Sequence, residues 1–105
     1  MPSQQAIERF TLAFHRQAVV RLREHDELRE QALSVIDRWE AGGMSTSSRR
    51  YRDEWRSLLR GDPAQLERAI CSTSEHAATL RSMSPLGFVL TPAERMHIRQ
   101  EAMAA

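Results

Sequence analysis

The sequence predicts an all-α fold, a small helical bundle with a long N-terminal helix and four or five helices in total. Three observations predict it. Apolar residues recur every three or four positions through the first forty residues. Two short segments, DPAQ and TPAE, place a capping residue before a proline, as helix N-termini do. No segment shows the alternating pattern of a strand, and 105 residues suit a single domain over 1–105.

The N-terminal part, residues 1–43, carries one apolar stripe between a start at Ser3 and a stop at Gly42 and Gly43. The stripe is weakest near His25 and Asp26, where polar residues interrupt it. Two interpretations follow: one long or slightly kinked helix of nearly forty residues, or a helical hairpin that turns at His25. The absence of Gly and Pro favours the long helix. The stripe comprises Ile7, Phe10, Phe14, Ala18, Leu22, Leu28, Ala32, either Val35 or Ile36, and Trp39.

Residues 44–105 are expected to form a compact helical part. One helix covers 48–60, a second starts after Asp62, and a third starts at Thr91, with Glu94 completing a capping box, and ends near 102. The segment 71–75 leaves two alternatives open, one bent helix or two short ones. Pro85 and Gly87 interrupt helix between these elements, so residues 84–90 are expected to be an extended link. Its expected apolar anchors are Leu86, Phe88, Val89 and Leu90.

Helix 48–60 carries the surplus positive charge, because residues 44–60 have a net charge of +3 and the flanking segments −1 each. At 100° per residue four arginines fall within about 80° of one another, while the aromatic residues at 51 and 55 face the core. We expect this arginine face to meet an acidic protein partner, with nucleic acid or a merely solvated surface as alternatives. The predicted partner-binding residues are Arg49, Arg52, Arg56 and Arg60.

Catalytic and metal-binding sets are not evident. Cys71 is the single cysteine, and the four histidines are scattered, so no cofactor and no metal are expected. Arg9 and His15 have the spacing of the arginine and histidine pair of HEPN-type ribonucleases, which makes such an enzyme the alternative to a noncatalytic protein. The sequence shows neither a secretory signal nor an apolar run of about 20 residues, so we expect a cytoplasmic protein without membrane contact.

Two segments, YRDEWRSLL and LRSMSPLGFVLTPAER, resemble small helical proteobacterial proteins of the antitoxin or regulator type over residues 48–99. The resemblance implies a noncatalytic protein-binding module that binds and masks a partner protein. A dimeric DNA-binding regulator using helix 48–60 is the alternative. We expect a homodimer formed through the long N-terminal stripe. The resemblance depends on Tyr51, Trp55, Leu58, Leu59, Leu80, Arg81, Ser84, Pro85, Leu90, Glu94 and Arg95.

Overall fold

The computed structural model describes residues 3–104, and this part of the chain is all helical, without a strand. The all-α prediction is therefore confirmed, with six α-helices rather than four or five. The helices are α1 (Gln4–Glu24), α2 (Glu27–Ala41), α3 (Arg49–Arg60), α4 (Pro63–Ile70), α5 (Glu75–Ser82) and α6 (Pro92–Ala104), and a 3₁₀ turn, η1 (Thr46–Ser48), precedes α3.

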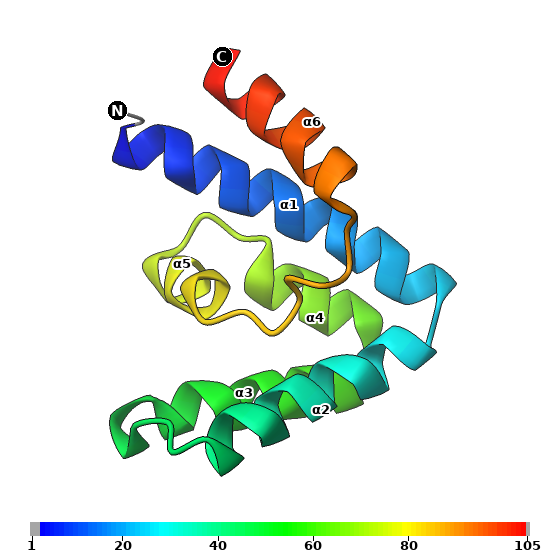
Figure 1. Cartoon of the computed structure of the whole chain (residues 1–105), viewed down its shortest axis with the longest axis vertical. Coiled ribbons are helices and arrows are strands. Elements are labelled where there is room, and N and C mark those ends of the chain that lie inside the picture. Colours follow the sequence, from blue (N-terminus) through cyan, green and yellow to red (C-terminus); the bar gives the residue numbers. More distant parts are fainter. Residues whose placement is uncertain (1–2, 105) are drawn as a thin grey trace.

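The helices form three layers (Figure 1). The first and last helices, α1 and α6, lie side by side at the top, α4 and α5 form the middle layer, and α2 packs along α3 at the bottom. The described ends of the chain lie near each other at the same side of the molecule. The Cα trace measures 37 × 31 × 24 Å.

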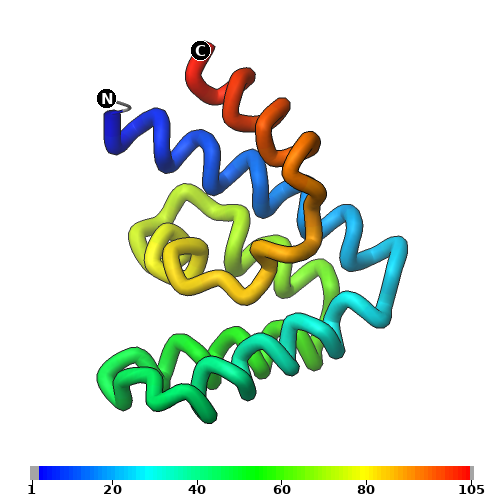
Figure 2. The backbone as a smooth tube through the Cα atoms, in the orientation of Figure 1, coloured from blue at the N-terminus to red at the C-terminus, as the bar shows by residue number. Residues whose placement is uncertain are grey.

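The prediction of a long N-terminal helix is confirmed by α1, which has 21 residues. The preferred interpretation of one helix of nearly forty residues is wrong, because the chain turns at His25 as in the hairpin alternative and continues as α2. The chain leaves α1 at His25, whose φ of −138° and ψ of 92° are extended, and α2 runs back beneath the middle layer (Figure 2). The polar segment around His25 offers nothing to bury, whereas reversal brings Ala32, Leu33 and Ile36 into the core. No glycine is required, because any residue adopts this conformation.

Local capping explains where the helices begin. The hydroxyl of Ser3 accepts from the Ala6 N–H, the carboxylate of Asp62 accepts from the Ala64 N–H, and the hydroxyl of Ser74 accepts from the Ala77 N–H at the start of α5. The α6 start is a reciprocal capping box: the Glu94 N–H donates to Thr91, and the Thr91 N–H donates to Glu94. Residues 71–74 separate α4 from α5, so the two-helix alternative holds there.

The core lies where the three layers meet. Trp55 of α3 is 1% exposed, and its indole N–H donates to the Leu80 carbonyl at 2.9 Å. The link between α5 and α6 closes the core with Leu86, Val89 and Leu90, whereas Phe88, expected as a fourth anchor, is 40% exposed. The side chains with the least exposure are Trp55, Leu22, Ile36, Leu59, Leu66, Ile70, Leu80, Leu86, Val19 and Pro85.

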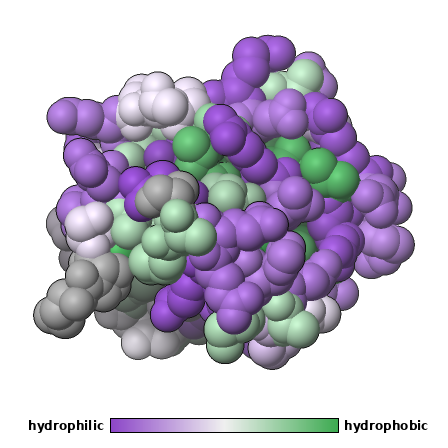
Figure 3. Space-filling model, turned by 90° about the horizontal axis from the view of Figure 1, so that it is seen from above, coloured by the Kyte–Doolittle hydropathy of each residue, from purple (hydrophilic) through white to green (hydrophobic). Residues whose placement is uncertain are grey.

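Most of the apolar stripe of α1 is covered within the chain, although Ile7 at its start is 42% exposed. Phe14, Ala18 and Leu22 are buried, and α1 contacts α4, α5 and α6. A second copy of the chain is therefore not needed to cover most of the stripe, which weakens the reason for expecting a homodimer; the homodimer itself stays a prediction. The face over α1 and α6 is mostly hydrophilic, with separate apolar groups (Figure 3).

Candidate interaction surface on α2 and α3

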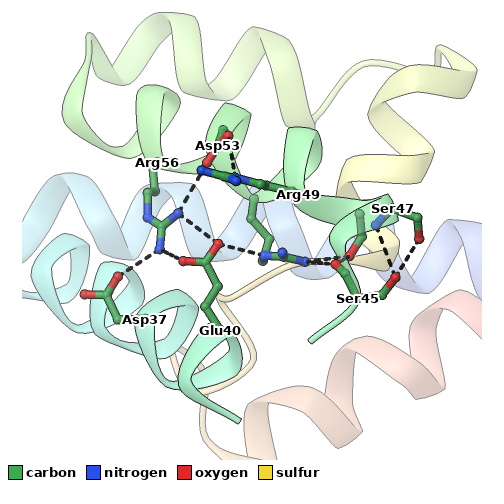
Figure 4. A network of polar contacts seen from close by, with 9 residues as sticks. Asp37, Glu40, Ser45, Ser47, Arg49, Asp53 and Arg56 are labelled. Atoms are coloured by element: carbon green, nitrogen blue, oxygen red, sulfur yellow. Dashed lines mark hydrogen bonds and ion pairs between the residues drawn. The ribbon is translucent and has the colours of Figure 1, made fainter. Parts of the chain in front are cut away.

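The four predicted arginines do not share one open face. Glu40 of α2 lies between two of them and joins α2 to α3 (Figure 4). Its Oε2 accepts from Arg52 Nε at 3.0 Å and from Arg56 Nη1 at 3.2 Å, and its Oε1 pairs with Arg56 Nη2. Arg56 also donates to Asp37 Oδ1 at 2.9 Å and to Asp53 Oδ1 at 3.3 Å. Charge-assisted bonds of this kind hold long side chains in fixed positions.

Arg52 is a structural residue. Its side chain is 5% exposed, and its Nη1 donates to the Ser45 carbonyl at 3.0 Å and to the Ser48 hydroxyl at 2.6 Å. The guanidinium therefore ties the turn before α3 to α2. The prediction that all four arginines lie on the outer face is wrong for Arg52, and Arg56 is only 18% exposed. Helical spacing could not reveal this, because the partner carboxylate comes from another helix.

The electrostatics of this cluster follow from the same contacts. Hydrogen bonds from Arg56 and Arg52 lower the pKa of the Glu40 carboxyl to about 2. Hydrogen bonds to Glu40 and Asp37 raise the pKa of Arg56 above its usual value. Glu40 and Arg56 are consequently charged at neutral pH and form a fixed pair of opposite charges between α2 and α3.

Arg49 and Arg60 lie at opposite ends of α3 and remain accessible. The Arg49 side chain is 71% exposed and reaches Asp53 at 3.8 Å, the i,i+4 contact that the sequence predicts. Arg60 is exposed and makes no ion pair within residues 3–104. A shallow hollow lined by Arg56, Ser57 and Arg60 lies beside it.

This surface, which we call the α2–α3 face, is defined by Asp37, Glu40, Arg49, Arg52, Asp53, Arg56 and Arg60. It has four guanidinium groups and three carboxylates, so its field is mixed in sign. Met44, in the turn after α2, is 44% exposed and adds an apolar group next to this face. The α2–α3 face can therefore recognise a partner through ion pairs and hydrogen bonds.

Arg9 and His15, which have the spacing of the HEPN-type pair, lie in different environments. His15 is 3% exposed, its ring contacts Phe14 and Trp55, and its Nδ1 lies 2.7 Å from the Thr11 carbonyl oxygen. Burial lowers the pKa of His15 to about 4. Arg9, in contrast, is exposed and donates from Nε to the Ala102 carbonyl at 3.2 Å. The two side chains therefore do not meet at an exposed surface.

Other candidate groups are placed as follows. Cys71 ends α4 and is partly buried, and burial raises the pKa of its thiol. Arg81, 7% exposed, donates to the carbonyls of Ile70 and Ser72 and so holds the α4–α5 connection. In residues 3–104 no group of three or more metal-ligating side chains gathers. None of the described helices has the length and apolar character to cross a membrane.

Sequence reasoning did not single out Asp37, Glu40 or the buried state of His15. The carboxylates occupy polar positions of α2 that look solvent-facing, and only the return of α2 along α3 brings them to the arginines. His15 carried a usable signal, since it is one residue from Phe14 and three from Ala18 in the buried stripe.

In comparisons with known proteins, no family model, no curated protein and no solved structure matches this chain.

Proposed function

We propose that this chain is a noncatalytic protein-binding module of the antitoxin or small-regulator type, which binds and masks an acidic partner protein in the cytoplasm through the α2–α3 face. One observation supports the proposal above the others. Glu40 fixes Arg52 and Arg56 in the free protein, while Arg49 and Arg60 stay accessible at the two ends of the same helix.

This arrangement favours binding because some of its side chains already have fixed positions before a partner binds. Immobilising a flexible side chain on binding costs about 0.5–1.5 kcal/mol, and the contacts that already hold Arg56, which is 18% exposed, reduce this cost. Arg49 and Arg60 are available for carboxylates of the partner, and Met44, in the turn that precedes α3, supplies an exposed apolar group. The charges also speed the encounter and favour one orientation.

The test is capture of a partner followed by reconstitution. The tagged chain is used to recover proteins from the native host, alongside Arg49→Glu/Arg60→Glu and the matched control Arg16→Glu/Arg68→Glu. The control arginines are exposed on α1 and α4 and make no ion pair within residues 3–104. We expect one acidic protein that binds the wild type and the control but not the α3 variant.

The purified pair is then measured by calorimetry. We expect each reversed charge to weaken binding about tenfold or more, with a moderate dependence on salt. Equal binding by the α3 variant, or equal loss in both double variants, would contradict the assignment of this face.

The alternative, a dimeric DNA-binding regulator using helix 48–60, is distinguished by salt. A protein that contacts several phosphates loses duplex affinity steeply as salt rises, with a log–log slope of about −0.9 per phosphate contacted. The three carboxylates among the arginines of the α2–α3 face argue against such contacts. A steep slope that the Arg49→Glu/Arg60→Glu variant flattens would replace the protein-binding proposal with the DNA-binding one.

A further inference from the structure

A small hollow lies on the opposite side of the core from the α2–α3 face, between α1 and the segment that leads into α6. Its volume is about 140 Å³. Phe10 and Phe14 provide aromatic walls, Thr11 and Ser84 provide hydroxyl groups, and His15 is the most deeply buried side chain of the lining. Nothing in the proposed function uses this hollow.

The hydrogen bonding of His15 defines its chemistry. Nδ1 lies 2.7 Å from the Thr11 carbonyl oxygen, and a carbonyl can only accept, so Nδ1 carries the proton. Nε2 of the neutral ring is then an acceptor. It is buried, and no donor reaches it from residues 3–104. A buried acceptor without a donor is costly, and native proteins usually satisfy such atoms with water or a ligand.

The walls of the hollow suit a flat ring. Phe14 meets His15 edge to face with a centroid distance of 5.4 Å, and Phe10 lies 6.1 Å from Phe14. Arg95 lies over the Phe14 ring, with its guanidinium carbon 5.2 Å from the centroid, and donates to the Gly87 carbonyl. Nε2 of His15 has less than 1 Å² of accessible surface, so a ligand reaches it only when the wall of the hollow opens; Arg95 is an exposed side chain of that wall.

We propose that this hollow binds a small hydroxylated aromatic molecule of about the size of phenol, whose ring lies against Phe10 and Phe14 and whose hydroxyl donates to His15 Nε2. The volume agrees with this class, since an apolar protein cavity of about 150 Å³ holds one benzene molecule. The aromatic walls favour a ring over a cluster of water molecules, and the unmet acceptor favours a ring that has an O–H.

Phenol and toluene test the proposal as a matched pair, because they have the same size and only phenol has a donor. Each is titrated into the full ¹⁵N-labelled chain at pH 7 and followed by NMR. We expect saturable shifts of residues 10–15 and 84–95, with phenol binding about tenfold more tightly than toluene. The ¹⁵N resonance of His15 Nε2 should move in the direction of hydrogen-bond acceptance with phenol and stay in place with toluene.

The variant His15→Phe keeps a ring and removes the acceptor, and His25→Phe is its control at the exposed histidine that follows α1. We expect His15→Phe to bind phenol and toluene equally, and His25→Phe to keep the tenfold preference. Saturation by neither compound, equal affinities in the wild type, or an unmoved Nε2 resonance with bound phenol would each overturn the proposal. The Nε2 measurement uses the wild type, so it decides the question even if His15→Phe fails to fold.

Discussion

Acidification should destabilise this protein through His15 at a pH well above that of ordinary carboxylate titration. The pKa of His15 falls from 6.5 to about 4 in the folded protein, chiefly because burial disfavours the charged ring; the nearby positive charge of Arg81 acts in the same direction. The unfolded chain therefore binds a proton more readily than the folded one. The contribution of neutral His15 to the free energy of unfolding is complete above pH 6.5 and is lost as the pH falls toward 4.

The size of the effect follows from these two pKa values. Linkage gives a loss of about 2 kcal/mol in the free energy of unfolding between pH 7 and pH 5 from this one residue. Glu40 and Glu94 also have lowered pKa values, through hydrogen bonds from Arg56 and from the Thr91 N–H. Their stabilisation is lost only below about pH 4.5, so the window from pH 7 to 5 isolates the histidine.

The assay is urea unfolding followed by circular dichroism at pH 7, 6 and 5, with the wild type, His15→Phe and His25→Phe. We expect the wild type and His25→Phe to lose about 2 kcal/mol more across this range than His15→Phe does. If His15→Phe keeps the full pH dependence, another group is responsible and the account of His15 as a buried neutral ring is incorrect.

Three further substitutions test the fold. Arg52→Met should lower the free energy of unfolding by about 2 kcal/mol, because the hydrogen bonds of the buried guanidinium are lost. Arg49→Met, at an exposed position, should change it by less than about 0.5 kcal/mol, and urea unfolding measures both. Gly43→Ala should cost about 1 kcal/mol, because φ is +88° there, and Gly42→Ala, at a φ of −82°, should cost less; equal losses would contradict the backbone argument. Trp55→Phe should cost about 2 kcal/mol through a lost bond and a smaller ring, as thermal unfolding can show.

Helix starts were predictable because their causes are local. A serine, aspartate or threonine accepts an N–H within three residues, and this is visible in the order of the amino acids at Ser3, Asp62 and Thr91. The stop at Gly43 is equally local, since the positive φ there favours glycine. The turn at His25 had no such marker, because an extended residue between two helices is open to any side chain.

The roles of the arginines depended on the tertiary arrangement. The angular positions along α3 were right, but whether a guanidinium at such a position is free or paired depends on which helix lies opposite. Only after the reversal at His25 does Glu40 come within hydrogen-bonding distance of Arg52 and Arg56. One error, the preference for a continuous helix, therefore caused the other, the assignment of Arg52 to the outer face.

The pairing of α1 with α6 has a consequence for biosynthesis. Contacts between them join residues far apart in the sequence: Arg21 pairs with Glu94 across 73 positions, and Arg9 reaches the Ala102 carbonyl across 93. On the ribosome α1 emerges before α6, and its side toward α6 stays uncovered until synthesis has passed α6. The nascent chain must keep this amphipathic helix from aggregating throughout that interval, so chaperone contacts during translation should concentrate on the segment from Ile7 to Leu22.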